Sequence, residues 1–250
     1  MESTISKIWH SYSQNGYLNV TDNTEQKLSQ LVLGLPVTNI LGIMNRTIRK
    51  IVYDSRKVEP GSLFVAIPGG NLDGGAFIKD AINQGTSAFI TQTPLDSLNE
   101  LSLGSRDVTA LCVEDSRIAL SIVSANFYHS PSERLALTGI TGTNGKTTTS
   151  YILEALFRAE GIGVIGTIDY HYDGKNFPAP VTTPESLDLN RMLNEMTEEK
   201  IEKCILEVSS HALHQSRVHD MRFKAGIFTN LSRDHLDFHG DMGHYKNAKK

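Results

Sequence analysis

The chain has 250 residues, of which 39% are hydrophobic and 21% are charged. This composition excludes a disordered chain and predicts one large or two smaller globular domains. The formal net charge of -4 gives no electrostatic reason to expect a nucleic-acid partner. No apolar run approaches the roughly 18 residues that a membrane span needs, and the N-terminus has no signal-peptide core.

Two cysteines, Cys112 and Cys204, lie inside apolar runs. We expect both to be buried, reduced thiols of a cytoplasmic protein. A disulfide between them is the weaker alternative.

The first part of the chain alternates strands and helices. Residues 1–26 are polar without sustained periodicity, so we expect a loosely ordered extension there. Helices are predicted from Leu28 to Gly34, at 75–85, and at 116–129 with Ser116 as the cap. Apolar runs predict strands at 48–56, 62–67, 87–91 and 108–115. The turn signal Glu59-Pro60-Gly61 separates the first two of these strands.

The second part alternates more regularly, after a predicted interdomain connection at 128–135. Helices are predicted at 146–161 and from Thr183-Pro184-Glu185, where proline would take the first helical position. A strand and a small hairpin turning at Asp173-Gly174 are expected within 163–177. Buried strands are predicted at 134–140, 201–208 and 223–230. This alternation is typical of a parallel α/β sheet.

The stretch "LTGITGTNGKTTTS", residues 137–150, resembles a phosphate-binding loop without its usual first glycine. The general pattern, Gly-x4-Gly-Lys-Ser/Thr, would place that glycine at Ile140. The context is nevertheless right, because an apolar strand precedes the loop and a helix follows it. Lys146 would neutralise the β and γ phosphates, and the Thr147 hydroxyl would bind Mg²⁺. A Gly/Thr-rich turn that binds nothing is the alternative.

Glu207 ends the apolar strand "CILEV", at the edge of a parallel sheet where ligands bind. Because an unpaired carboxylate is costly to desolvate there, Glu207 is a candidate second Mg²⁺ ligand. A glutamate that merely points to solvent is the alternative.

His235 and His239 are four residues apart, a spacing that would suit zinc on a helix. Leu236 occupies the glutamate position of the His-Glu-x-x-His signature and no cysteine is near, which disfavours zinc. His235 beside a magnesium–phosphate centre is the preferred interpretation. For His211, His214, His239 and His244 we expect ordinary hydrogen-bonded or surface side chains. Arg217 could bind a carboxylate or phosphate, or be a solvated surface charge.

Four ordered motifs, "TGTNGKTTT", "TTPES", "EVSSHAL" and "NLSRDHLDFHGDMGHYKNAKK", resemble the Mur ligase family. "YDSRKVEPGSLFVAIPGGNLDG" resembles the N-terminal UDP-binding domain of the same family. The resemblance runs from about Lys27 to the last residue and is most marked to members that extend UDP-N-acetylmuramoyl-L-alanyl-D-glutamate. In this family TGTNGK(T/S) is the usual phosphate loop, which accounts for Ile140.

The resemblance implies an α/β fold with a UDP-muramoyl-binding domain at 27–130 and a parallel-sheet, P-loop ATPase-like central domain at 131–250. It implies an ATP-dependent ligase of peptidoglycan precursor synthesis that adds meso-diaminopimelate, or L-lysine, through an acyl phosphate. The family's C-terminal domain, which binds the incoming amino acid, would lie beyond Lys250, so we expect a truncated chain and a monomer. A fragment that binds nucleotide or UDP-muramoyl groups without turnover remains the alternative.

The resemblance also implies the role of each site residue. It implies Mg²⁺ at Thr147 and Glu207, and a second Mg²⁺ at His235 and a carbamylated Lys249. Ser55 corresponds to a UDP contact. The expected ATP contacts are Gly142, Thr143, Asn144, Gly145, Lys146, Thr147 and Thr148. The expected contacts to the muramoyl-dipeptide are Thr182, Thr183, Ser209, Gln215 and Arg217.

Two rival nucleotide-binding classes share only part of this pattern. Folylpolyglutamate synthase has the loop and the chemistry, but its loop usually reads Gly-Lys-Gly-Ser, whereas Thr147-Thr148 follows the lysine here. A GTPase-type switch would need a base-specificity motif such as Asn-Lys-x-Asp, and the sequence contains none.

Overall fold

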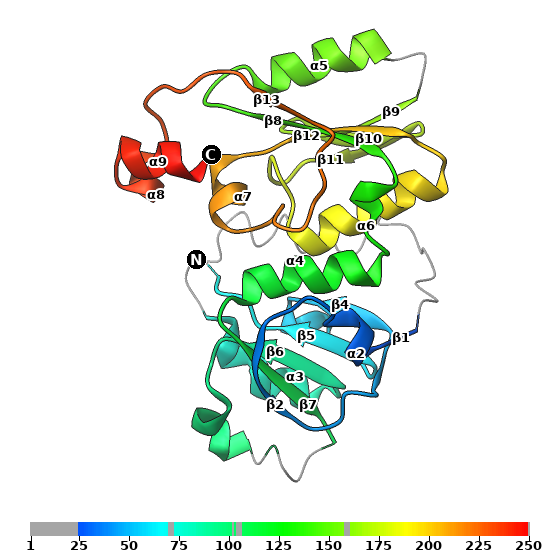
Figure 1. Ribbon diagram of the computed structural model, residues 1–250, viewed down its shortest axis with the longest axis vertical. Coiled ribbons are helices and arrows are strands. Elements are labelled where there is room, and N and C mark those ends of the chain that lie inside the picture. The colour runs from blue at the N-terminus through cyan, green and yellow to red at the C-terminus, as the bar shows by residue number, and fades with distance from the viewer. Residues whose placement is uncertain (1–24, 70–72, 102, 104–106, 158–160, 250) are drawn as a thin grey trace.

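The computed structural model describes residues 25–249, except 70–72, 102, 104–106 and 158–160. The chain forms two units, each built on its own β-sheet (Figure 1). The expected extension lies outside the described residues up to position 24, but Gln26 already begins strand β1 (Gln26–Lys27). Among the helices of the described ranges, none has the length and apolarity needed to cross a membrane.

The sheet of the first unit has five strands in the order β2-β7-β6-β5-β4. Four of them run parallel, and β2 pairs antiparallel with β7 at one edge. The four predicted strands are confirmed, in shorter form, whereas β2 and the β1–β3 pair were not predicted. The strands are β2 (Val37–Leu41), β3 (Thr47–Ile48), β4 (Lys50–Val52), β5 (Ser62–Val65), β6 (Ala88–Thr91) and β7 (Thr109–Val113).

All three predicted helices of this unit are present, with one correction. Asp115, not Ser116, caps the third helix, because its carboxylate accepts from the backbone amides of Arg117 and Ile118 at 2.8 Å and 3.0 Å. The hydroxyl of Ser116 is buried and donates to Gln92. The helices are α2 (Leu28–Leu31), α3 (Ile78–Asn83), α4 (Ser116–Phe127) and the short 3-10 turns η1 (Ser55–Lys57), η2 (Gly74–Phe77) and η3 (Leu95–Leu101).

The sheet of the second unit has six strands in the order β11-β10-β9-β12-β8-β13. Four neighbouring strands of this sheet, β9, β12, β8 and β13, are parallel. β10 and β11 form the predicted hairpin, whose turn residues Asp173 and Gly174 have φ of 49° and 70°. β13 lies at the edge with three of four residues exposed, so the prediction of a buried strand there was wrong. The strands are β8 (Ala136–Thr141), β9 (Ile162–Ile165), β10 (Asp169–Tyr172), β11 (Lys175–Pro178), β12 (Lys203–Glu207) and β13 (Ala225–Phe228).

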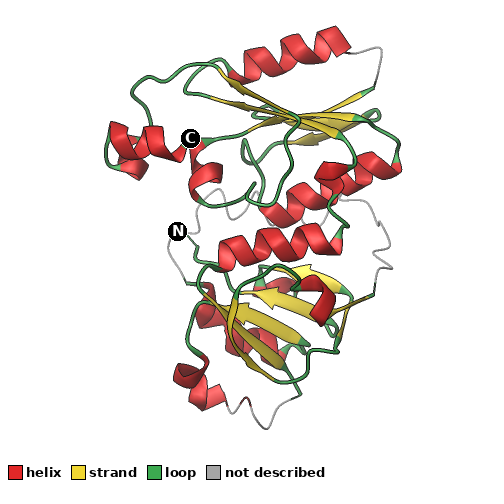
Figure 2. Cartoon of the chain, in the orientation of Figure 1, coloured by secondary structure: helices red, strands yellow, loops and turns green. Residues whose placement is uncertain are grey.

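Helices lie on both sides of the sheet of this unit (Figure 2). One of the two predicted helices starts later than expected, and the short helices after β12 and β13 were not predicted. The helix expected at Pro184 begins at Ser186, after Glu185. Its expected cap residue, Thr183, instead donates its hydroxyl to the backbone oxygen of Glu207 at 2.8 Å, so the tertiary contact prevails over local capping. The helices are η5 (Pro131–Glu133), α5 (Lys146–Phe157), α6 (Ser186–Glu198), α7 (Ser210–His214), α8 (Leu236–His239) and α9 (Met242–Ala248).

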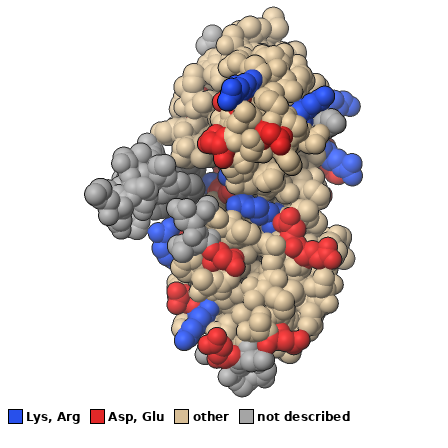
Figure 3. Space-filling view, turned by 90° about the vertical axis from the view of Figure 1, so that its left-hand side faces the viewer, with Lys and Arg blue, Asp and Glu red and all other residues tan. Residues whose placement is uncertain are grey.

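The two units meet where α4 packs against α6 (Figure 1). An ion pair of 3.3 Å joins Arg117 to Glu185, and the Tyr53 hydroxyl donates to Asp188 at 2.7 Å. These polar contacts fix the position of α6, and with it the loop before α6 that lies beside the second sheet. Acidic and basic side chains are interspersed on the face drawn in Figure 3. Cys112 and Cys204 are buried and free, as expected.

Candidate active site

The predicted phosphate loop connects the end of β8 to the start of α5. Gly142 has φ of 144°, and a Cβ built on it would lie 2.0 Å from the Thr229 hydroxyl oxygen. Only glycine fits at this point, because a side chain would collide with the segment after β13. The glycine that this loop requires is therefore Gly142. Ile140, where the general pattern has a glycine, is a fully buried residue of β8.

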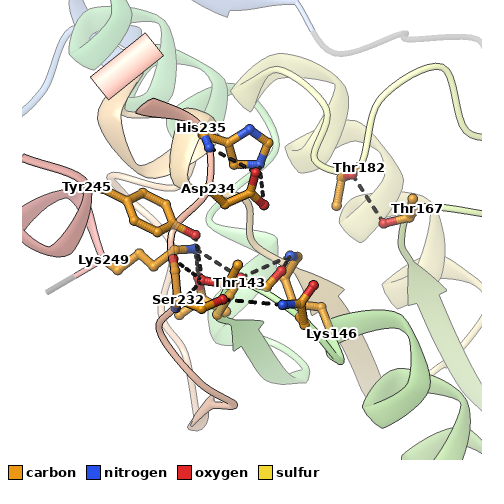
Figure 4. A network of polar contacts seen from close by, with 12 residues as sticks. Thr143, Lys146, Thr167, Thr182, Ser232, Asp234, His235, Tyr245 and Lys249 are labelled. Atoms are coloured by element: carbon orange, nitrogen blue, oxygen red, sulfur yellow. Dashed lines mark hydrogen bonds and ion pairs between the residues drawn. The ribbon is translucent and has the colours of Figure 1, made fainter. Parts of the chain in front are cut away.

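The segment after β13 holds the loop from behind. Thr143 donates its backbone amide to the carbonyl of Asn230 at 2.9 Å, and Asn144 donates its amide to the Asn230 side chain at 3.1 Å. The Thr143 hydroxyl lies 2.9 Å from the hydroxyl of buried Tyr245 and accepts from the Ser232 amide (Figure 4). These bonds fix the loop before any ligand arrives.

Lys146 is the first residue of α5, and its side chain curls back over the loop. Its ammonium group donates to the carbonyl oxygens of Gly142 at 3.0 Å and Thr143 at 3.1 Å. The lysine therefore places a positive charge beside the loop and the N-terminus of α5, where phosphate oxygens are favoured.

Glu207 ends β12, between β8 and β9, and is only 1% exposed. Its carboxylate accepts from the hydroxyls of Thr147 and Thr167, both at 2.9 Å, and from Ser150 at 3.3 Å. The alternative of a solvent-pointing glutamate is therefore wrong. A carboxylate beside a threonine hydroxyl is an oxygen-only donor set, which fits Mg²⁺ when nucleotide phosphates supply further ligands.

A pocket of about 570 Å³ opens above the loop. It brings together most of the predicted site residues, from all four motifs of this unit. Its lining comprises Thr143, Asn144, Gly145, Lys146, Thr147, Thr148, Thr167, Val181, Thr182, Thr183, Ser209, His211, Gln215, Arg217 and His235. Three further predicted site residues contact the lining or the loop from behind. They are Gly142, Glu207 and Lys249.

One wall of the pocket comes from the loop before α6 and from the two ends of α7. Ser209 caps α7 and donates its amide to the Thr183 hydroxyl at 3.0 Å. Arg217 donates to the Thr183 carbonyl at 2.6 Å and to the Gln215 side chain at 2.7 Å. Its side chain is 16% exposed and also lies 3.1 Å from Glu185, so the solvated surface-charge alternative is wrong.

His235 borders the pocket from the other side. It precedes α8 in the left-handed region, with φ of 50°, and its ring meets that of His211 edge-on at 4.9 Å. Within the described residues, no group of three or more His, Cys, Asp or Glu side chains is placed to hold a metal ion.

Of the four histidines expected to be ordinary, two depart from that expectation: His211, which lines the pocket, and His239. His239 is 8% exposed, its Nε2 atom makes no hydrogen bond among the described residues, and its ring packs on that of Tyr245. Burial and the neighbouring histidines lower the pKa of His239. His244, by contrast, is exposed and bonds to Asp241 at 2.8 Å.

Lys249 follows α9 and reaches the base of the loop. Its ammonium group donates to the Thr141 hydroxyl at 3.2 Å and to the Gly142 carbonyl at 3.1 Å (Figure 4). Burial and the nearby positive charge of Lys146 lower the pKa of Lys249 to about 8. The neutral form of this lysine is therefore accessible near physiological pH.

Ser55 lies apart from these residues. It begins η1, directly after β4 of the first sheet, and is not part of the pocket lining. The Ser55 side chain is buried. The preceding residue, Asp54, caps η1, because its carboxylate accepts from the Arg56 amide at 3.0 Å.

Sequence reasoning missed three residues of this region. Thr167 lines the pocket and bonds to Glu207, Tyr245 supports Thr143, and His211 packs against His235. His211 and Tyr245 stand inside quoted motifs, so a helical reading of 210–214 and 242–248 would have drawn attention to them. Thr167 lies outside every motif, and only the position of the β9 end beside Glu207 identifies it.

Comparison with known families gives two matches. The model of the Mur ligase middle domain matches residues 140–250, and that of the Mur ligase family catalytic domain matches residues 47–128. Among curated proteins, the chain is 44% identical over 225 residues to UDP-N-acetylmuramoyl-L-alanyl-D-glutamate--2,6-diaminopimelate ligase of Alkaliphilus oremlandii, with 89% of this chain and 45% of that protein covered. It is 47% identical over 204 residues to the protein of that name from Solibacter usitatus, with 80% and 40% covered.

Solved structures give the same result. A structure of a UDP-N-acetylmuramoyl-L-alanyl-D-glutamate--2,6-diaminopimelate ligase superposes with a TM-score of 0.72 at 26% identity, over 90% of this chain and 44% of that one. MurF from Acinetobacter baumannii shares the fold, with a TM-score of 0.59 at 20% identity, over 90% and 45% of the two chains. The chain spans about 45% of the length of the first curated relative. It carries the two domains that the family models describe and belongs to the Mur ligase family.

Proposed function

We propose that the chain supplies the nucleotide- and acceptor-binding part of an ATP-dependent ligase that extends UDP-N-acetylmuramoyl-L-alanyl-D-glutamate with a diamino acid. The observation that carries this proposal is that Thr147, whose hydroxyl donates to the buried Glu207, lines one pocket together with Thr182, Thr183 and Arg217. In this proposal a phosphate-and-metal site lies next to a polar wall that would hold an anionic peptide. In this proposal residues 27–130 bind the UDP end and 131–250 bind ATP.

The side chains of the pocket divide the work by position. The loop from Gly142 to Thr148, through the amides at the N-terminus of α5, and the Lys146 ammonium group would hold the β and γ phosphates. Thr147 and Glu207 would hold one Mg²⁺, and His235 with a carbamylated Lys249 would hold a second. Bound Mg²⁺ would neutralise charge that builds up on the transferred phosphoryl group.

The acceptor wall orients the substrate for the reaction. Thr182, Thr183, Ser209, Gln215 and Arg217 would align the free side-chain carboxylate of the D-glutamyl residue with the γ-phosphate. A carboxylate oxygen then attacks phosphorus and ADP leaves, which gives an acyl phosphate. The amine of the diamino acid attacks the acyl carbon, phosphate leaves, and the amine loses a proton. Catalysis of this kind consists largely of positioning and electrostatic stabilisation.

The identity of the added amino acid is a finer proposal. The names of the curated relatives contain 2,6-diaminopimelate, which supports meso-diaminopimelate rather than L-lysine. For the rest of the assignment we propose a UDP contact at Ser55, a monomer, and a cytoplasmic location consistent with two free cysteines.

The test combines binding and turnover. Calorimetric titration with ATP and with UDP-N-acetylmuramoyl-L-alanyl-D-glutamate should show one site for each on the wild-type chain. Phosphate release is then measured with ATP, this acceptor, and either diaminopimelate or lysine. Binding without phosphate release would support the fragment alternative. Binding of ATP with a folate in place of the muramoyl acceptor would contradict the proposal in favour of the folylpolyglutamate type.

A further inference from the structure

Thr167 stands between the two halves of the pocket. It lies two residues after β9, in the short connection to β10, and borders the pocket. Its hydroxyl oxygen is 3.2 Å from the Thr182 hydroxyl on the acceptor side (Figure 4). The same oxygen is 2.9 Å from Glu207 Oε2 on the metal side. Its one hydroxyl thus bonds directly to a side chain of each group.

The backbone before Thr167 is shaped for this contact. A Cβ added to Gly166 would lie 2.5 Å from Glu207 Oε1, so glycine allows the chain to pass close to the carboxylate. The Thr167 amide then lies 3.3 Å from the same oxygen. Thr167 therefore meets Glu207 with both its amide and its hydroxyl.

The direction of the hydrogen bonds follows from the chemistry of the three groups. An ionised carboxylate can only accept, so the single hydroxyl proton of Thr167 is donated to Glu207. Thr167 can then only accept from Thr182, whose own proton is used in that bond. The result is a chain of donors that runs from Thr182 through Thr167 to Glu207.

We propose that Thr167 is a positioning residue that holds the Glu207 carboxylate and makes Thr182 face the pocket as an acceptor. Thr182 then receives an N–H or O–H group of the muramoyl-peptide acceptor and cannot donate to it. One hydroxyl serves both sides of the pocket. Its removal therefore loosens the metal-side carboxylate and frees the Thr182 hydroxyl to donate into the pocket. This proposal rests on the proposed function for the identity of the acceptor, but not for the hydrogen-bond chain.

The first test needs no ligand. The free energy of unfolding is measured for the wild-type chain, Thr167→Val, Thr182→Val and the double variant by urea titration. If the two hydroxyls are bonded, the effects of the single substitutions do not add, because either one already breaks their bond. Additive effects would overturn the hydrogen-bond chain, whatever the protein binds.

The second test follows metal binding by electron paramagnetic resonance of Mn²⁺ in the presence of ATP. Thr167→Val should weaken Mn²⁺ affinity by about 10-fold, the typical cost of one hydrogen bond to a charged group. Thr167→Ser keeps the hydroxyl and should restore wild-type affinity. Thr91→Val is the matched control, since Thr91 is a buried threonine of β6 in the other sheet whose hydroxyl also accepts a bond, from the Thr93 amide.

The outcomes separate the two proposals. Equal Mn²⁺ affinity of Thr167→Val and wild type would overturn the positioning role. Weakened affinity in Thr167→Ser, as in Thr167→Val, would do so as well, because the hydroxyl would then not be the cause. A wild-type chain that binds neither Mn²⁺ with ATP nor the muramoyl acceptor would contradict the proposed function, and the unfolding cycle would still decide the hydrogen-bond chain.

Discussion

Lys146 and Lys249 donate to the same acceptor, the carbonyl oxygen of Gly142, at 3.0 Å and 3.1 Å. They reach it from opposite ends of the unit's sequence, from the start of α5 and from the residue after α9. Two positive charges at one carbonyl repel each other, which together with burial favours the neutral form of one of them. Burial and the positive charge of Lys146 lower the pKa of Lys249 to about 8.

We expect the neutral Lys249 amine to form a carbamate with CO₂. With a pKa of about 8, its neutral fraction at pH 8 is about half, whereas that of an ordinary lysine is well below a hundredth. At constant dissolved CO₂, the carbamate signal in ¹³C NMR with ¹³C-labelled bicarbonate should grow as pH rises through 8. Lys249→Arg should abolish it, and Lys246→Arg, an exposed lysine one turn earlier on α9, should not. An unchanged signal in Lys249→Arg would disprove the assignment.

Removal of the Lys146 ammonium group should impair turnover far more than folding. Lys146→Ala is expected to lower kcat by at least about 100-fold, the typical effect of losing one electrostatic contact to the transition state. Phosphate release by the active protein and ATP affinity by calorimetry are the two measurements. Lys79→Ala, an exposed lysine of α3, is the control and should behave as wild type. Near-normal kcat in Lys146→Ala would refute the role of the loop.

The motifs predicted the site better than periodicity predicted the elements around it. The phosphate loop, Arg217 and His235 line one pocket, with Glu207 behind its lining. The loop and Glu207 stand at the ends of the neighbouring strands β8 and β12, and Arg217 and His235 lie on the connections that follow β12 and β13. The carboxyl ends of parallel strands share one edge, so order along the sequence was enough to bring them together.

What the sequence left open depends on tertiary contacts. β13 has the apolar pattern of a buried strand, but its position at the sheet edge is a property of strand order and leaves Phe228 54% exposed. Thr183 is a residue type that often caps helices. Its hydroxyl nevertheless donates to the backbone oxygen of Glu207 instead of capping α6. Thr167 carries no local signal, because its partners are 15 and 40 residues away.

The close approach at Gly142 predicts a substitution that disables the loop. Gly142→Ala would place a methyl group 2.0 Å from the Thr229 hydroxyl oxygen, so either the loop or the segment after β13 must move. We expect ATP affinity to fall below detection by calorimetry and the protein to lose at least about 1–3 kcal/mol of stability from backbone strain. Gly174→Ala is the control, since it also has positive φ but meets nothing within 4 Å.

The two glycine variants separate strain from collision. Gly174→Ala should lose a comparable strain energy and retain ATP binding, because it lies in the hairpin between β10 and β11. If Gly142→Ala binds ATP as tightly as Gly174→Ala does, the loop does not depend on the contact with Thr229.

His171 should make the stability of the second unit depend on pH. Burial disfavours its charged form, but the hydrogen bonds to Asp169 at 2.7 Å and Glu154 at 2.9 Å outweigh burial and raise its pKa above 6.5. A group with a raised folded-state pKa binds its proton more tightly in the folded protein. Its stabilisation is therefore complete below pH 6.5 and is lost as pH rises through the folded-state pKa.

The measurement is the free energy of unfolding in urea between about pH 5.5 and 8.5, a range that spans the histidine titration. Wild type should lose stability across the upper part of that range, and His171→Gln should show a flatter profile because the titrating group is gone. His244→Gln removes an exposed histidine that also bonds to an aspartate, Asp241, and should keep the wild-type slope. Equal slopes for wild type and His171→Gln would mean that the bonds of His171 to α5 and β10 do not stabilise the folded state in a pH-dependent way.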